Sequence, residues 1–125
     1  METPLVIIHK EHAIKPCGVN GGAETATIQL AHALARLGKK VFLCANIPED
    51  SLLDKELDNL TYLNFGPTYD IPKALEELKT CYNCTRFHLI AVSRALPLLI
   101  SQRNENIISR ILICPEPAAG AFGIE

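Results

Sequence analysis

The chain has 125 residues, a length typical of one domain, and 48% of them are hydrophobic while 21% are charged. This composition predicts one folded domain over residues 1–125 and excludes a disordered or fibrous chain. The formal net charge of −2 gives no electrostatic reason to expect a nucleic-acid partner or an anionic membrane surface.

Apolar runs alternate with helical patterns in the first half of the chain. Residues 5–9 (LVIIH) are too short for a helix and rich in β-branched side chains, which predicts a strand. Residues 23–37 have helical period, with His32 on the polar stripe, and Gly38 follows as a stop signal. Residues 41–45 are continuously apolar and predict a strand buried on both faces. The helix is expected to turn its apolar positions to the core, namely Ala23, Leu30, Ala31, Leu34 and Leu37.

The alternation continues in the second half. Further strands are predicted over 60–65, 87–92 and 111–114, and helices over 52–57 and 94–103. Another helix is predicted after its possible cap Asp70, with apolar positions at helical spacing from Ile71 to Leu78. Ser93 can cap the helix over 94–103. Such a pattern predicts an α/β fold with a doubly wound, Rossmann-like parallel sheet of about five strands in the order 3-2-1-4-5.

The connection between the first strand and the first helix, residues 10–22, is about twice as long as the usual 2–6 residues. It leaves the carboxyl end of the strand, where open α/β sheets bind ligands. Gly21 and Gly22 remove two Cβ atoms where the helix begins, so that a ligand can approach the backbone N–H groups and the positive end of the helix dipole. The pattern favours a phosphate or a polar sugar as ligand, and a simple turn is the alternative.

Two common nucleotide-binding motifs are excluded by spacing. Gly18, Gly21 and Gly22 do not form G-x-G-x-x-G, and G-K-[ST] does not occur. The sequence therefore argues against a nicotinamide enzyme and against a P-loop NTPase.

Residues 18–44, GVNGGAETATIQLAHALARLGKKVFLC, resemble the start of the amino-terminal domain of GT-B glycosyltransferases of the family 4 type. The resemblance covers residues 5–46 well and continues loosely through 87–93 and 111–117. It implies a retaining hexosyltransferase that moves a sugar from a nucleotide-sugar donor to a sugar or lipid acceptor, without a metal or other cofactor. It also implies that this chain is the acceptor-side domain, inactive without a missing C-terminal domain that carries an E-x7-E element.

The resemblance also implies that the glycine pair approaches the donor diphosphate. The candidate substrate-binding residues, all expected at that edge of the sheet, are Gly21, Gly22, Asn20, Ser93, His9 and Glu116. No catalytic residue is assigned, because the family's histidines after strands four and five are replaced by the runs IAVS at 90–93 and CPE at 114–116.

Other polar residues have simpler explanations. Glu24 suits the positive end of the helix dipole, and His32 and His88 are expected to be structural. Cys81 and Cys84 form C-x-x-C at the carboxyl end of a helix, where the dipole disfavours a thiolate, so that redox and zinc roles have little support.

Compartment and alternative function follow from features outside these motifs. The segment METPLVIIHKEH lacks the basic start and cleavage site of a signal peptide, and no apolar run reaches the length of a membrane span. Cys44 and Cys114 fall in predicted buried strands, which favours a reducing compartment. We expect a cytoplasmic protein with at most peripheral membrane association.

The alternative function is a stand-alone α/β module that binds a ligand or a protein and catalyses nothing.

Overall fold

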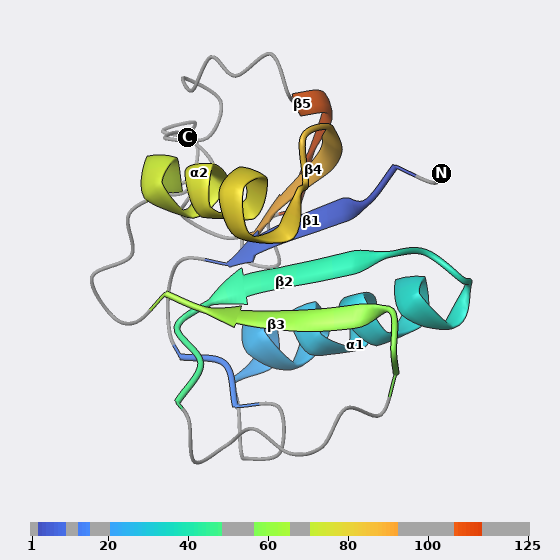
Figure 1. Ribbon diagram of the computed structural model, residues 1–125. Helices are drawn as coiled ribbons and strands as arrows, with labels where there is room; N and C mark the ends of the chain where they lie inside the picture. Colours follow the sequence, from blue (N-terminus) through green and yellow to red (C-terminus); the bar gives the residue numbers. More distant parts are fainter. Residues whose placement is uncertain are drawn as a thin grey trace, which may run out of the picture.

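The computed structural model describes residues 3–9, 13–15, 21–48, 57–65, 71–92 and 107–113. These residues form a parallel sheet with the strand order β3-β2-β1-β4-β5 and two helices (Figure 1). The elements in chain order are β1 (Leu5–His9), α1 (Gly22–Arg36), β2 (Val41–Ala45), β3 (Leu60–Asn64), α2 (Ile71–Tyr82), β4 (Phe87–Val92) and β5 (Ile107–Ile113). The predicted α/β fold with a parallel sheet is confirmed. The helices expected over 52–57 and 94–103 lie outside the described residues.

The sheet is centred on β1, which pairs with β2 on one side and with β4 on the other. All five residues of β2 are buried, as its continuously apolar sequence predicted. β5 begins at Ile107, four residues before the predicted start at Ile111. Ser109 and Arg110 interrupt the apolar pattern there. β5 is the last strand in the order of the described sheet, and edge strands accept polar residues.

The core has two layers, one on each face of the sheet. Val6 and Ile8 of β1 belong to the layer that includes Leu78 of α2. Ile7, between them in sequence, belongs to the layer that includes Ala31 of α1. Because successive side chains of a strand point to opposite faces, α1 and α2 cover opposite faces of the sheet.

The buried face of α1 differs from the predicted one. It consists of Glu24, Thr27, Ala31 and Ala35, which follow helical spacing, whereas Leu37 is 75% exposed. Of the predicted apolar positions, Ala31 is buried and Leu30 and Leu34 pack against the same core layer, so the prediction is wrong at Leu37 and lacked the two polar residues. The helix ends before Gly38, whose φ of +89° confirms its predicted role as a stop.

Asn59 ties the end of α1 to the start of β3. Its side-chain Nδ2 donates hydrogen bonds to the carbonyl oxygens of Ala35 and Lys39, each at 2.6 Å. The same residue's carbonyl oxygen accepts a hydrogen bond from the Val41 amide at 2.8 Å. One amide side chain thus fixes the turn that leads from α1 into β2.

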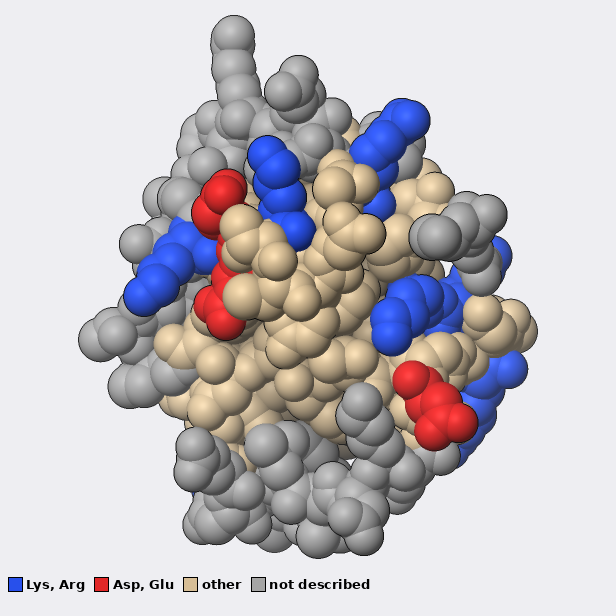
Figure 2. Space-filling model, viewed as in Figure 1, with Lys and Arg blue, Asp and Glu red and all other residues tan. Residues whose placement is uncertain are grey.

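The described surface carries mixed charges. Figure 2 shows Lys and Arg side chains interspersed with acidic and uncharged residues on the viewed face. None of the helices in the described part of the chain has the length and apolar character needed to cross a membrane.

Candidate functional site

The candidate site lies where α1 begins, on the side of the sheet toward which β2 and β3 point (Figure 1). Gly21 is the N-cap residue with an extended backbone, φ −69° and ψ 175°. Its carbonyl oxygen accepts the first helical hydrogen bond, from the Thr25 amide at 3.0 Å. The amides of Gly22, Ala23 and Glu24 therefore have no acceptor within the helix and point out of its first turn.

A buried cluster of polar side chains joins β1 to this first turn. His9, the last residue of β1, is 0% exposed, and Glu24 and Thr27 are 4% and 2% exposed. His9 Nε2 lies 3.0 Å from Glu24 Oε2, and His9 Nδ1 lies 3.0 Å from Thr27 Oγ1. Both ring nitrogens of His9 are thus used inside the chain, and the helix is held against the end of the strand.

The three hydrogen-bond contacts of His9, Glu24 and Thr27 determine where the protons of this cluster lie. The Thr27 hydroxyl has one hydrogen, and it donates to the Ala23 carbonyl oxygen at 2.9 Å. Thr27 Oγ1 must then accept from His9 Nδ1, which requires a proton on that nitrogen. All three contacts are hydrogen bonds at once only when a second proton lies between His9 Nε2 and the Glu24 carboxylate. In that state the pair has no net charge, which is the form least costly to bury.

The two glycines of the loop have different surroundings. A Cβ atom on Gly21 would lie 2.6 Å from Glu24 Oε1, whereas a Cβ atom on Gly22 would have no atom of the described part of the chain within 4 Å. Neither glycine has a positive φ. Gly21 is therefore explained by the Glu24 carboxylate, which folds back over it. The described chain gives no packing or backbone reason for glycine at position 22.

The predicted site residues are brought together only in part. His9, Gly21 and Gly22 all lie at the end of β1 and the start of α1. His9 is fully buried, so that its predicted role as a ligand contact stays a prediction, and its position favours holding α1 in place. Asn20, Ser93 and Glu116 lie outside the described residues.

Sequence reasoning missed the buried role of Glu24 and Thr27. The position of Glu24 could have indicated this role. It is the third residue of the helix after the N-cap Gly21, and a glutamate at that position commonly reaches back over the N-cap. A histidine ending a buried strand supplied a partner for that carboxylate.

Hydrogen bonds also connect the segments that follow β1 and β2 at this edge. The Ile14 amide donates to the Asn46 carbonyl oxygen at 2.8 Å, and the Ile47 amide donates to Asn64 Oδ1 at 2.9 Å. Ile14 and Ile47 are both fully buried. These contacts give the described parts of the edge a defined backbone around the start of α1.

The remaining candidates have structural roles. His32 Nε2 lies 2.8 Å from Tyr62 Oη, and His88 Nδ1 lies 2.6 Å from Ser109 Oγ.

The C-x-x-C pair at the end of α2 is split between surface and interior. Cys81 is exposed, whereas Cys84 is buried. Burial raises the pKa of the Cys84 thiol to about 11, which disfavours the thiolate that redox chemistry or zinc binding needs. Within the described residues no group of His, Cys, Asp and Glu side chains is arranged to hold a metal ion.

Comparison with protein-family models, curated proteins and solved structures gave no match to this chain.

Proposed function

We propose that this chain is the amino-terminal, acceptor-side domain of a GT-B glycosyltransferase of the family 4 type. The observation that carries the proposal is the open start of α1, where a Cβ atom on Gly22 would meet no described residue within 4 Å. Three amides without helical acceptors and the positive end of the helix dipole suit a diphosphate. In the proposed enzyme these amides approach the diphosphate of a nucleotide-sugar, while a second domain with an E-x7-E element binds the nucleotide.

The arrangement of the sheet supports a doubly wound, Rossmann-like domain of five strands. The chain adds β2 and β3 on one side of β1 and then β4 and β5 on the other. The order therefore reverses between β1 and β4, and open α/β sheets bind ligands beyond the carboxyl ends of the strands at this switch point. β1 ends at His9 and β4 ends at Val92, so both strands have their carboxyl ends at that point.

The described residues would serve this function mainly by positioning. The pair formed by His9 and Glu24 fixes the first turn of α1 against β1. Gly21 makes room for the Glu24 carboxylate, and Gly22 leaves room for the ligand. The sugar or lipid acceptor would lie in the cleft between the two domains, no metal or other cofactor is required, and the cytoplasm is the proposed compartment.

A sugar-transfer assay tests this proposal. The 125-residue chain alone should transfer no sugar from any nucleotide-sugar, because the proposed site is formed between two domains. The protein encoded with its second domain should be active, and Gly22→Ala should lower that activity strongly while the melting temperature stays within about 3 °C. Turnover by the chain alone, or full activity in the Gly22→Ala variant, would contradict the proposal.

A second candidate function is a stand-alone α/β module that binds a ligand without catalysis. It is favoured by a pocket at the opposite edge of the sheet, lined by residues that include Lys40 and Arg86. The two candidates are separated by the natural reading frame: continuation past Glu125 into a second Rossmann-like domain with E-x7-E favours the transferase, and its absence favours the binding module.

A further inference from the structure

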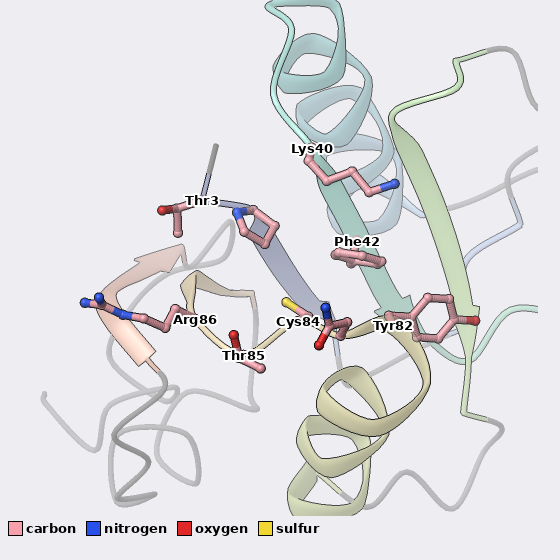
Figure 3. A pocket seen from close by; sticks show the side chains of 9 residues that line it. Thr3, Lys40, Phe42, Tyr82, Cys84, Thr85 and Arg86 are labelled. Carbon is pink, nitrogen blue, oxygen red and sulfur yellow. The ribbon is translucent and has the colours of Figure 1, made fainter. Parts of the chain in front are cut away.

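A pocket of about 520 Å³ lies at the amino edge of the sheet, opposite the start of α1 (Figure 3). Its walls come from the residues that precede or begin β1, β2 and β4, including Pro4, Lys40 and Arg86. The volume is within the range of small-molecule sites, about 300–1,000 Å³. The pocket is therefore large enough for a ligand and distant from the candidate transfer site.

The charged residues of this pocket are all cationic. Lys40 and Arg86 line it, and none of the described residues of its walls is acidic. Neither cation forms an ion pair with a described residue, since the ion pair found in the described part of the chain joins His9 and Glu24. The chain as a whole has a formal charge of −2, so that this concentration of positive charge is local. Like charges left without a counterion attract an anionic ligand.

An aromatic pair forms the apolar part of the pocket. The rings of Phe42 and Tyr82 meet edge to face, with centroids 5.6 Å apart and an interplanar angle of 66°. Phe42 is buried, and Tyr82 is 43% exposed. The Lys40 Nζ atom lies 5.2 Å from the Phe42 ring centroid. A cationic group and aromatic surface thus occur side by side, which suits a ligand that combines a flat ring with an anionic group.

The turn after α2 brings hydrogen-bonding groups to the same pocket. Asn83 has a φ of +53°, a left-handed conformation that asparagine tolerates better than most residues. This turn lets the Cys84 amide donate to the Leu78 carbonyl oxygen at 2.9 Å. Asn83 and Thr85, on either side of the buried Cys84, are exposed and line the pocket.

We propose that this pocket binds a small organic anion that carries a flat apolar ring. The ring lies against Phe42 and Tyr82, and the anionic group lies near Lys40. Figure 3 shows Arg86 toward the other end of the pocket, beyond Cys84 and Thr85, so that Arg86 adds positive potential without contacting the same group. This site is independent of the proposed glycosyltransferase function.

Backbone-amide NMR of the isotopically labelled chain tests this inference. The probe is 1-naphthoate, and the matched control is the neutral 1-naphthamide, which has the same ring. We expect 1-naphthoate to give saturable shifts at the amides of Lys40, Asn83, Thr85 and Arg86. We expect 1-naphthamide to bind at least about tenfold more weakly, because it lacks the charge-assisted contact.

Charge variants assign the contact to one end of the pocket. Lys40→Gln should weaken 1-naphthoate binding at least about fivefold, and Arg86→Gln by about twofold. Lys79→Gln, on the exposed surface of α2, is the matched control and should leave binding unchanged. Equal affinity for the two probes, NMR shifts that do not saturate, or shifts centred on Gly22 would overturn the inference. Equal losses of 1-naphthoate affinity in the Lys40→Gln and Lys79→Gln variants would also overturn it. The two-probe comparison uses the unaltered chain, so it stands even if a variant folds poorly.

Discussion

At the carboxyl edge of the sheet a buried cluster of polar side chains joins β1 to α1, whereas at the amino edge backbone hydrogen bonds and the Asn59 side chain connect the elements. His9 and Glu24 meet at 3.0 Å at the first edge. At the second edge the Leu5 amide donates to the Lys40 carbonyl oxygen at 2.8 Å. The His88 amide donates to the Pro4 carbonyl oxygen at 3.0 Å. Buried polar side chains therefore determine the shape of one edge. At the other edge, backbone hydrogen bonds and the Asn59 side chain order the turns, and side chains such as Lys40 line a pocket.

Removing the buried carboxylate should have the largest effect on stability and sharpen this comparison. Glu24→Ala leaves His9 Nε2 buried without its partner, which should lower the free energy of unfolding by about 2–4 kcal/mol. Urea denaturation measures the loss. The matched control is Glu76→Ala on the exposed surface of α2, which should change stability by less than about 0.5 kcal/mol. Similar small changes in both variants would show that the carboxyl edge does not depend on its side chains.

The pH dependence of stability tests the burial of Cys84 at the amino edge. Burial raises the pKa of the Cys84 thiol from 9.0 to about 11. The unfolded chain therefore loses this proton at a lower pH than the folded chain. The stabilising effect is complete below about pH 9 and is lost as the pH rises through about 11, by at most about 3 kcal/mol.

The measurement is the free energy of unfolding from pH 8 to about pH 11 in wild type and two variants. Cys84→Ala should lose this part of the slope, whereas Cys81→Ala, which alters the exposed cysteine, should keep it. An unchanged slope in Cys84→Ala would show that the thiol does not lie in a buried environment.

The two glycines give a smaller and more local test of the carboxyl edge. Gly21→Ala places a Cβ atom 2.6 Å from Glu24 Oε1 and should cost about 1–2 kcal/mol, because the carboxylate must move away from His9. Gly22→Ala meets no described atom within 4 Å and should leave stability unchanged or raise it by up to about 0.5 kcal/mol. Melting temperatures of both variants check this difference.

A double-mutant cycle assigns the cost to its cause. In a Glu24→Ala background, Gly21→Ala should cost less than about 0.5 kcal/mol, because the atom that it displaces is gone. An equal cost in both backgrounds would mean that Gly21 is required for a reason other than Glu24.

The sequence predicted the elements better than their faces. The apolar runs of β1, β2 and β4 gave the correct strand bounds, because short buried strands have a continuous hydrophobic signal. The period of α1 located the helix to within one residue at each end. Its buried face was predicted only in part. Ala31, Leu30 and Leu34 do face the core, whereas Glu24 and Thr27 are buried by contacts with His9 that no hydrophobicity pattern contains.

For the candidate sites, too, the sequence predicted the location better than the contacts of the individual residues. The glycine pair was visible in the sequence, since both glycines stand together after a strand. The different roles of Gly21 and Gly22 were not visible, because they depend on which atoms surround each residue in space. The amino-edge pocket was also not predicted, because its walls join residues as distant in sequence as Pro4 and Arg86 through parallel strand pairing.

The central claim is that the open start of α1 holds a diphosphate, and a titration of the labelled chain with inorganic pyrophosphate tests it most directly. The account predicts saturable shifts of the Gly22, Ala23 and Glu24 amides, because these N–H groups have no acceptor within the helix. It also predicts weaker binding in the Gly22→Ala variant at unchanged stability. Absence of shifts at these amides, or shifts of the same size in the Gly22→Ala variant, would contradict it.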